Sequence, residues 1–263
     1  MPTAPNETIL TERRGRVFWI TFNRPEVRNA MTLAMYERLY EILGELEREA
    51  DLGAVVLCGA GERAFVAGTD IKEFVNFTSA EDALRYEQRM DDILSRLERL
   101  KYPTIAALRG ACTGGGAAIA CACDLRIAAP SLRFGFPIAR TLGNCLSIKN
   151  LARLEALVGE AEVKRLLYTS DLLDAERAYT LGLASELAGD DASLLVRAAE
   201  LASQIAANAP LTIRSTKEAL RRLRDQGADA GDDDLVLACY QSNDFREGIA
   251  AFLGKRAAQW SGS

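Results

Sequence analysis

Three consecutive glycines, Gly114 to Gly116, are the clearest sign of possible chemistry in this sequence. They follow an apolar run and open a segment of small residues that is compatible with a helix. Glycine is entropically costly, so a triplet occurs where backbone approaches something closely or adopts unusual dihedral angles. A turn leading into a helix leaves unpaired N–H groups beside the positive end of the helix dipole. Such a turn can hold a phosphate or a developing oxyanion, or it can let a helix pack closely against a strand.

The sequence has no histidine among its 263 residues, which excludes several kinds of catalytic site. A Ser-His-Asp triad, a histidine general base and a histidine-containing metal site are all impossible. Acid–base work must fall to Asp, Glu, Tyr, Cys, Lys, bound water or the substrate itself. The six cysteines lack CxxC spacing and lie mostly in apolar stretches, so we expect buried thiols rather than disulfides or metal ligands.

The overall composition is that of an ordinary globular protein. Hydrophobic residues make up 49% of the chain and charged residues 26%, with a net charge of -5. This charge gives no footprint for nucleic acid or an anionic membrane. No apolar run approaches the roughly 20 residues needed to span a bilayer, and the first residues lack the pattern of a secretory signal. We therefore expect a cytoplasmic protein with no nucleic-acid or membrane partner.

The elements around the glycine triplet predict a mostly parallel α/β core. Two runs of β-formers split by Gly15 predict a hairpin, and Thr32 is the expected N-cap of the first helix. The stretch from Gly59 to Phe74 is expected to be a loop that turns into a helix near Asp70. Strands are predicted over 9–13, 17–22, 54–58, 104–108 and 125–128, and helices over 33–46 and 81–100. Strands alternating with helices favour a parallel sheet.

From about Leu151 the pattern predicts helices alone. Asp171 and Asp174 are expected caps, and Gly182 is an expected helix stop. The acidic, glycine-bearing stretch from Asp225 to Asp234 is expected to be a solvated loop. The predicted helices are 148–157, 160–167, 174–181, 192–207, 211–224, 234–242 and 243–253.

Four stretches together resemble the crotonase superfamily, also called the enoyl-CoA hydratase/isomerase family. They are NRPEVRNAM (23–31), AFVAGTDIKEF (64–74), IAALRGACTGGGAAIACACDLRIA (105–128) and DFREGIAAFLGKR (244–256), in the family's order and at about its spacing. The resemblance implies a crotonase/ClpP-like α/β fold, with repeated ββα units in a spiral core and an all-helical C-terminal trimerisation region. It implies an acyl-CoA-binding core over 1–195 and a region over 196–263 that covers the CoA site and assembles a homotrimer or a dimer of trimers.

The resemblance also assigns roles to backbone groups. It implies that the N–H groups of Thr69 and Gly115 hold the thioester carbonyl oxygen of an acyl-CoA substrate. An enolate or tetrahedral oxyanion needs fixed donors in a dry site, and one such donor is typically worth roughly 3–4 kcal/mol. Coenzyme A would enter as part of the substrate, with no permanently bound cofactor and no metal. Asp70 and Asp124 match recurrent positions that we expect to be structural.

The same matching implies a set of contacts to the CoA moiety. Arg28 either reaches a CoA phosphate or is a plain surface arginine. The C-terminal members of the set come from a neighbouring subunit in some proteins of the family. The implied CoA-contacting residues are Glu26, Val27, Arg28, Ala30, Ala67, Phe252 and Lys255.

The sequence departs from the family pattern at two acid–base positions. The family's hydratases use two glutamates, and Ala118 and Ile138 stand in their places. Adding water across an enoyl double bond needs a base to activate water and an acid to protonate the α-carbon. The sequence therefore argues against ordinary hydratase activity, although hydratase/isomerase remains the nominal class.

Four nearby residues are candidates for the missing group, each with a structural alternative. Cys145 is either a thiolate nucleophile, activated by Arg140, or a cysteine that is packed or merely lines the pocket. Arg140 either binds a carboxylate of the acyl group or forms a salt bridge with a neighbouring helix. Asn144 precedes Cys145 in the same loop. Glu73, one turn beyond Thr69, either faces the cleft or lies on a solvated helix surface.

The leading interpretation is an acyl-CoA-processing lyase or isomerase of fatty acid metabolism that acts through an enolate. Decarboxylation, isomerisation and thioester hydrolysis are the alternative reactions. Decarboxylation of a malonyl-type acyl-CoA is preferred among them, because its substrate supplies the driving force and needs the oxyanion donors more than a protein acid. A different class of function is a catalytically silent acyl-CoA-binding protein or a structural subunit.

Overall fold

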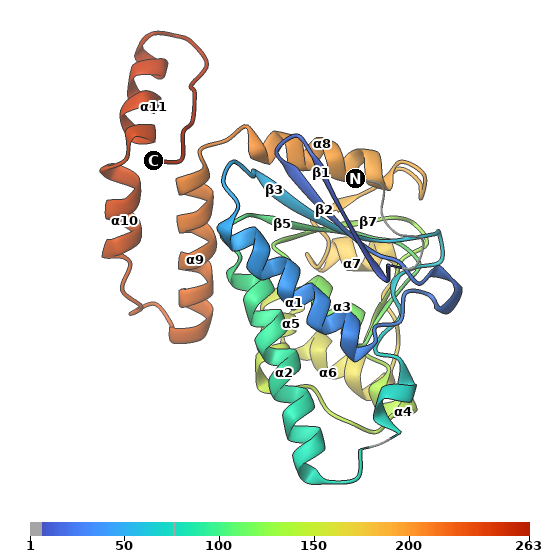
Figure 1. Cartoon of the computed structure of the whole chain (residues 1–263). Helices are drawn as coiled ribbons and strands as arrows, with labels where there is room; N and C mark the ends of the chain where they lie inside the picture. The colour runs from blue at the N-terminus through green and yellow to red at the C-terminus, as the bar shows by residue number, and fades with distance from the viewer. Residues whose placement is uncertain (1–6, 76) are drawn as a thin grey trace.

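The computed structural model describes residues 7–75 and 77–263, and its centre is a six-stranded sheet (Figure 1). The strand order is β1-β2-β3-β5-β7-β9. The first pair is an antiparallel hairpin, as predicted, and every later pairing is parallel. The strands are β1 (Ile9–Arg14), β2 (Val17–Phe22), β3 (Ala54–Gly59), β5 (Thr104–Leu108), β7 (Leu125–Ala128) and β9 (Glu186–Leu187).

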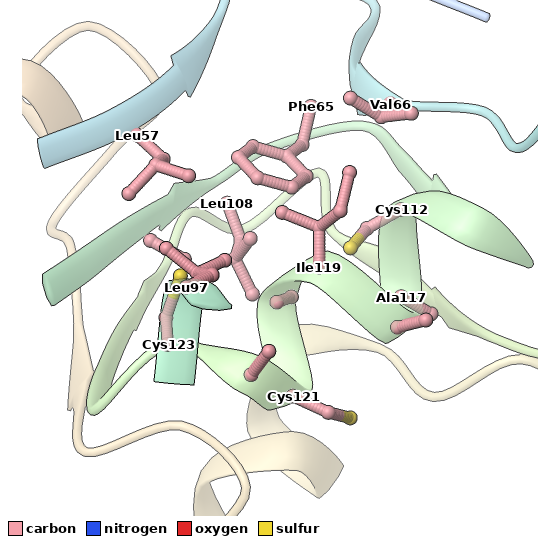
Figure 2. Close-up of a cluster of buried hydrophobic side chains, with 14 of the residues drawn as sticks. Leu57, Phe65, Val66, Leu97, Leu108, Cys112, Ala117, Ile119, Cys121 and Cys123 are labelled. Atoms are coloured by element: carbon pink, nitrogen blue, oxygen red, sulfur yellow. The ribbon is translucent and has the colours of Figure 1, made fainter. Parts of the chain in front are cut away.

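Helices cover both faces of this sheet, which explains why its central strands are apolar throughout. One face packs on α1 (Leu33–Arg48), α2 (Ala80–Arg99) and α3 (Gly115–Ala122), and the other on α8 (Leu194–Ala206). The predicted N-cap is confirmed, because Thr32 Oγ1 accepts from the N–H of Met35 at 3.2 Å. Figure 2 shows Leu57 and Leu108 of the sheet meeting Leu97 of α2 and Ile119 of α3.

A second, three-stranded sheet lies beside the first in the order β4-β6-β8. It consists of β4 (Ala64–Val66), β6 (Ala111–Thr113) and β8 (Arg133–Gly135), all parallel. The prediction of a loop from Gly59 to Phe74 is therefore wrong for β4, because three residues are too few to show an alternating pattern. Successive β3-β4-α2 and β5-β6-α3 segments form the repeated ββα units. Asp70 begins η2 (Ile71–Phe74) as its cap.

The region after β8 is almost entirely helical. It contains α4 (Ile138–Thr141), α5 (Ile148–Val158), α6 (Glu160–Thr169) and α7 (Ala175–Thr180), and Asp174 caps α7 as predicted. The expectation of helices alone is wrong at β9, whose two residues pair with β7. Two residues carry no periodic signal, so tertiary pairing alone defines this strand.

Three C-terminal helices stand apart from this body (Figure 1). They are α9 (Pro210–Gln226), α10 (Asp233–Tyr240) and α11 (Asn243–Leu253), here called the C-terminal arm. The expected division near residue 195 falls at the start of α8, which packs on the sheet, whereas the arm begins at Pro210. Lys217 ties α9 to the body through an ion pair of 2.7 Å with Asp124. Within the described residues, no helix is long and apolar enough to cross a membrane.

Candidate functional site

The glycine triplet forms a tight turn between β6 and α3. Gly114 has a φ of +52°, a conformation that favours glycine, and its N–H donates to the carbonyl of Gly135 at 3.0 Å. A Cβ on Gly115 would lie within 3.0 Å of the Tyr36 hydroxyl, and one on Gly116 would meet the Val66 carbonyl equally closely. Close packing therefore accounts for part of the triplet. It leaves the N–H of Gly115, the first residue of α3, without an intrahelical acceptor.

A second loop brings another backbone donor beside this turn. Gly68 has a φ of +113°, and its carbonyl accepts from the N–H of Met31 at 2.8 Å. The N–H of Asp70 donates to the Met31 carbonyl at 2.8 Å, which fixes Thr69 between two backbone hydrogen bonds. Within residues 7–75 and 77–263, neither Thr69 N–H nor Gly115 N–H donates to a protein acceptor. Both residues line the same cavity.

This cavity has a volume of about 240 Å³ and a largely apolar lining. In the part of the chain that the structure describes, its lining contains no lysine or arginine and one carboxylate, that of Glu87. Two backbone donors facing an apolar cavity can stabilise a negatively charged oxygen more strongly than they would in water. The apolar side chains include Phe74, Met90, Leu94, Ala118, Ile138 and Leu146.

Two tyrosines bracket the side chain of Thr69. The hydroxyls of Tyr36 and Thr69 lie 3.0 Å apart, and those of Thr69 and Tyr86 lie 2.9 Å apart. Burial raises the pKa of Tyr36 strongly, and burial raises the pKa of Tyr86 to about 12. Both phenols are therefore neutral at pH 7 and act as hydrogen-bonding groups, not bases. Neither tyrosine was among the site residues expected from the sequence.

Glu87 is the acidic side chain that the sequence analysis missed. It is half-buried in the cavity lining, and burial, with the nearby charge of Asp91 as the second cause, raises its pKa. No hydrogen bond or ion pair to its carboxylate is present among the described residues. On the same helix Glu98, in contrast, pairs with Arg153 at 3.1 Å. The missed signal was an acid on the apolar face of an amphipathic helix.

The sequence is similar to known proteins over nearly its whole length. Residues 12–263 match the family described as Enoyl-CoA hydratase/isomerase. The chain belongs to the enoyl-CoA hydratase/isomerase family. It is 33% identical over 251 residues to the short-chain-enoyl-CoA hydratase of Clostridium acetobutylicum, covering 94% of this chain and 95% of that protein. It is 30% identical over 257 residues to the crotonyl-CoA hydratase of Syntrophomonas wolfei, covering 97% and 98%.

Solved structures of the family share the fold at full length. An enoyl-CoA hydratase/carnithine racemase from Magnetospirillum magneticum aligns with a TM-score of 0.90 at 32% identity, covering 98% of this chain and 97% of that one. An enoyl-CoA hydratase from Bacillus anthracis aligns with a TM-score of 0.89 at 31% identity, covering 98% and 100%. These likenesses confirm the predicted crotonase-type α/β fold.

The structure separates the four acid–base candidates of the sequence analysis. Asn144 and Cys145 line the cavity from an exposed loop. Arg140 is exposed on α4 and Glu73 lies on η2, and neither belongs to the cavity lining.

Ala118 and Ile138, the positions at which the resemblance to hydratases implies glutamates, both line the cavity. Both side chains are buried and apolar. The cavity wall at these two positions therefore offers no proton donor or acceptor.

Most of the expected CoA contacts lie at Ala67, in the cavity lining, or on the turn that is hydrogen-bonded to it. Ala67 lines the cavity, and its N–H donates to the carbonyl of Arg28 at 3.0 Å. Glu26 and Val27 are exposed on the adjacent short helix η1 (Pro25–Val27), and Ala30 follows the same turn. The backbone there is unusual, because Arg28 has a positive φ of 54°. This turn is thus held directly against the Thr69 loop.

The remaining expected contacts lie elsewhere. Phe252 and Lys255 are exposed at the end of the C-terminal arm, which Figure 1 shows pointing away from α4 and the body of the same chain. Asp70 pairs with Arg24 at 3.3 Å, and Asp124 accepts from Thr104 and Lys217. Both aspartates thus make the structural contacts that were expected of them.

Proposed function

We propose that this protein is an acyl-CoA-processing enzyme that forms a thioester enolate. The observation that supports this proposal is that Thr69 and Gly115 line one cavity and that, among the described residues, their backbone N–H groups have no protein acceptor. An enolate oxygen placed between them would receive two fixed hydrogen bonds in a cavity with a largely apolar lining. Loss of one such donor typically lowers kcat by roughly 10²–10³-fold. Coenzyme A enters as part of the substrate, over Ala67 and the turn at residues 26–30.

The cavity lining does not support water addition by a pair of carboxylates. Ala118 and Ile138 are apolar, and Glu87 is the one carboxylate lining the cavity within the described ranges. Hydration needs two groups, one to activate water and one to protonate the α-carbon. The relatives named above are hydratases, so crotonyl-CoA is the substrate that tests this point first.

Among the other reactions of the family, double-bond isomerisation fits the cavity best. A malonyl-type group would bring a second carboxylate beside Glu87, and the described lining contains no lysine or arginine to balance it. This lining argues against the decarboxylation that the sequence analysis preferred, and thioester hydrolysis again needs an activated water. Isomerisation requires only that a proton leave one carbon of an apolar acyl chain and return to another.

The test is turnover of a panel of thioesters by the purified protein, followed by mass spectrometry and chromatography. A 3-enoyl-CoA should convert to the 2-enoyl-CoA, and crotonyl-CoA should yield no 3-hydroxyacyl-CoA. Comparable hydration of crotonyl-CoA would contradict the proposal. If no thioester reacts but they raise the melting temperature, the protein is a silent binder. Ligand at 100 times its Kd stabilises by about 2.7 kcal/mol, which such a measurement detects.

We further propose that the chain assembles as a trimer or a dimer of trimers through the C-terminal arm. No residue of α9 or α10 is fully buried within the chain, and large apolar side chains are exposed along the arm, with Phe252 84% exposed. In such an assembly Phe252 and Lys255 of one copy would reach the CoA edge of the next. Sedimentation should give a multiple of three times 28.6 kDa. The mass of a single chain would contradict this.

A further inference from the structure

We propose that Glu87 of α2 is the catalytic acid–base group that moves the proton between acyl carbons. This inference rests on the proposed function and deepens it. It places proton transfer on a helix that the sequence comparison left without a role, opposite the apolar Ala118 and Ile138. Four independent features of the site support it.

The first feature is the face of α2 that carries Glu87. Met90 and Leu94 follow it at i+3 and i+7, and all three line the cavity. Residues at these spacings lie on one side of a helix, so the carboxylate shares a face with side chains buried in the cavity wall. Met90 and Leu94 are themselves buried, which fixes the rotation of this helix turn relative to the cavity.

The second feature is a direct link between this turn and the backbone donors. Tyr86 precedes Glu87, and its hydroxyl lies 2.9 Å from Thr69 Oγ1. The ring of Tyr86 also packs edge-on against Phe74, with centroids 5.1 Å apart. The helix turn that carries the carboxylate is therefore attached to the residue whose N–H would hold the thioester oxygen. Glu87, Thr69 and Gly115 line the same cavity, so the carboxylate and the two backbone donors border the space in which the thioester would lie.

The third feature is that the carboxylate has no other task. Among the described residues no donor or cation pairs with Glu87, whereas Asp91 on the next turn accepts from Ser147 Oγ at 2.7 Å. Burial and the charge of Asp91 raise the pKa of Glu87. A raised carboxylate pKa moves toward the working pH, where one group exchanges protons in both directions most efficiently.

The fourth feature is that the competing phenols and carboxylates are poorly suited to the task. The titratable and charged groups around Glu87 are Tyr36 of α1, Tyr86 and Asp91 of α2, and Cys145 of the exposed loop. Glu73 of η2 lies near enough for its charge to act on Tyr86. The phenols are neutral because burial raises the pKa of both tyrosines. Asp91 and Glu73 do not line the cavity.

The proton transfer balances with no co-reactant. The Glu87 carboxylate takes a proton from C2 of a 3-enoyl thioester, and the electron pair of that C–H bond moves into the carbonyl. The resulting dienolate has its negative oxygen between the N–H groups of Thr69 and Gly115. The neutral Glu87 carboxyl then returns the proton to C4. The C2–H bond is broken, a C4–H bond is formed, and the double bond moves from C3–C4 to C2–C3.

The experiment compares the full-length protein with E87Q and with E81Q, a matched control on an exposed part of the same helix. Conversion of 3-hexenoyl-CoA to 2-hexenoyl-CoA is followed, together with the melting-temperature shift caused by the same thioester. E87Q should lose at least about 10²-fold in kcat, in line with removal of a general acid–base group. It should keep the thioester-induced melting shift, and E81Q should match the wild type in both.

The outcomes distinguish this inference from the proposed function. If the wild type reacts and E87Q retains its rate, Glu87 is not the acid–base group and the enolate proposal stands. If E87Q loses both turnover and the melting shift, Glu87 serves binding and the inference is wrong. If the wild type converts no thioester, the proposed function fails and this inference fails with it.

A second variant reports on Glu87 through its pKa. D91N removes the neighbouring charge that raises the pKa of Glu87, while its amide oxygen can still accept from Ser147. The acidic limb of the kcat pH profile should therefore shift to lower pH in D91N, because the active carboxylate forms earlier. An unshifted limb would overturn the assignment, since a merely structural role for Glu87 predicts no such change.

Discussion

Replacing Gly115 with alanine tests how closely the glycine turn is packed against its surroundings. A Cβ at this position would lie within 3.0 Å of the Tyr36 hydroxyl, and its next contacts are Thr69 Oγ1 at 3.1 Å and the ring carbon Cζ of Tyr36 at 3.4 Å. Removing only the hydroxyl with Y36F would thus convert a clash into an ordinary contact. We predict that Y36F partly rescues G115A.

The expected losses of unfolding free energy follow from the contacts that each substitution changes. G115A should cost about 1–3 kcal/mol of unfolding free energy through overpacking, because Tyr36 is buried and cannot swing away. Y36F alone should cost about 1 kcal/mol, since Thr69 Oγ1 keeps its contact with Tyr86. Independent effects would therefore sum to about 2–4 kcal/mol. We expect the double variant to lose at least about 1 kcal/mol less unfolding free energy than that sum.

The assay is equilibrium urea unfolding of the four proteins in this double-mutant cycle. The matched control is G116A, whose Cβ would meet the backbone carbonyl of Val66, which no side-chain truncation removes. Y36F should therefore leave the cost of G116A unchanged. Additivity of G115A and Y36F within about 0.5 kcal/mol would refute the proposed contact. In activity, G115A should also lower kcat, because the displaced N–H no longer points at the same place.

Three further variants test the electrostatics of the chain. E87Q should melt at a higher temperature than the wild type at neutral and alkaline pH and match it below about pH 4. The reason is that the pKa of Glu87 is raised in the folded state, so the wild type loses stability as pH rises through that pKa. A higher melting temperature of the wild type at neutral pH would contradict this. R153M should lower the unfolding free energy by about 3 kcal/mol in urea titrations, because the Arg153 side chain is only 3% exposed and Glu98 loses one of its two arginine partners. A change below about 1 kcal/mol would show that Glu98 and Arg224 rearrange to compensate. K217M should increase amide hydrogen exchange in α9 but not in α3, because it removes one of the two ion pairs, Lys217–Asp124 and Arg224–Glu98, that tie α9 to the body. Unchanged exchange in α9 would show that the remaining contacts hold the arm.

Much of the body of this fold was predictable because its signals are local. The apolar strands β3 and β5, the Thr32 cap and the amphipathic helix α2 each carry a pattern several residues long. The strands β4, β6, β8 and β9 were missed, because two or three residues have no measurable period and depend on pairing with distant segments. Local patterns thus define the layers, and long-range pairing defines the remaining strands.

In the candidate site, too, local sequence features were predictable and features that depend on long-range packing were not. The glycine triplet stood out from its residues alone, whereas the Thr69 loop entered through the family resemblance. Both line one cavity, with positive φ angles at Gly68 and Gly114 and close packing at Gly115 and Gly116. Glu87 was missed, because the apolar face of α2 on which it lies was interpreted as packing surface alone. Its role emerges only when α2 is packed against the Thr69 loop, which places this one acid in the cavity lining.

The most direct test of the central claim is the incorporation of deuterium during turnover in D₂O. The wild type is incubated with 3-hexenoyl-CoA and with crotonyl-CoA, and the products are analysed by mass spectrometry. An enolate held by Thr69 and Gly115, with proton transfer by one carboxylate, predicts 2-hexenoyl-CoA in which part of the substrate's C2 proton is carried to C4. Fewer than one solvent deuterium should therefore be incorporated per turnover, with no hydrated product from either thioester. Formation of 3-hydroxybutanoyl-CoA from crotonyl-CoA, without exchange or isomerisation of the 3-enoyl substrate, would contradict the account.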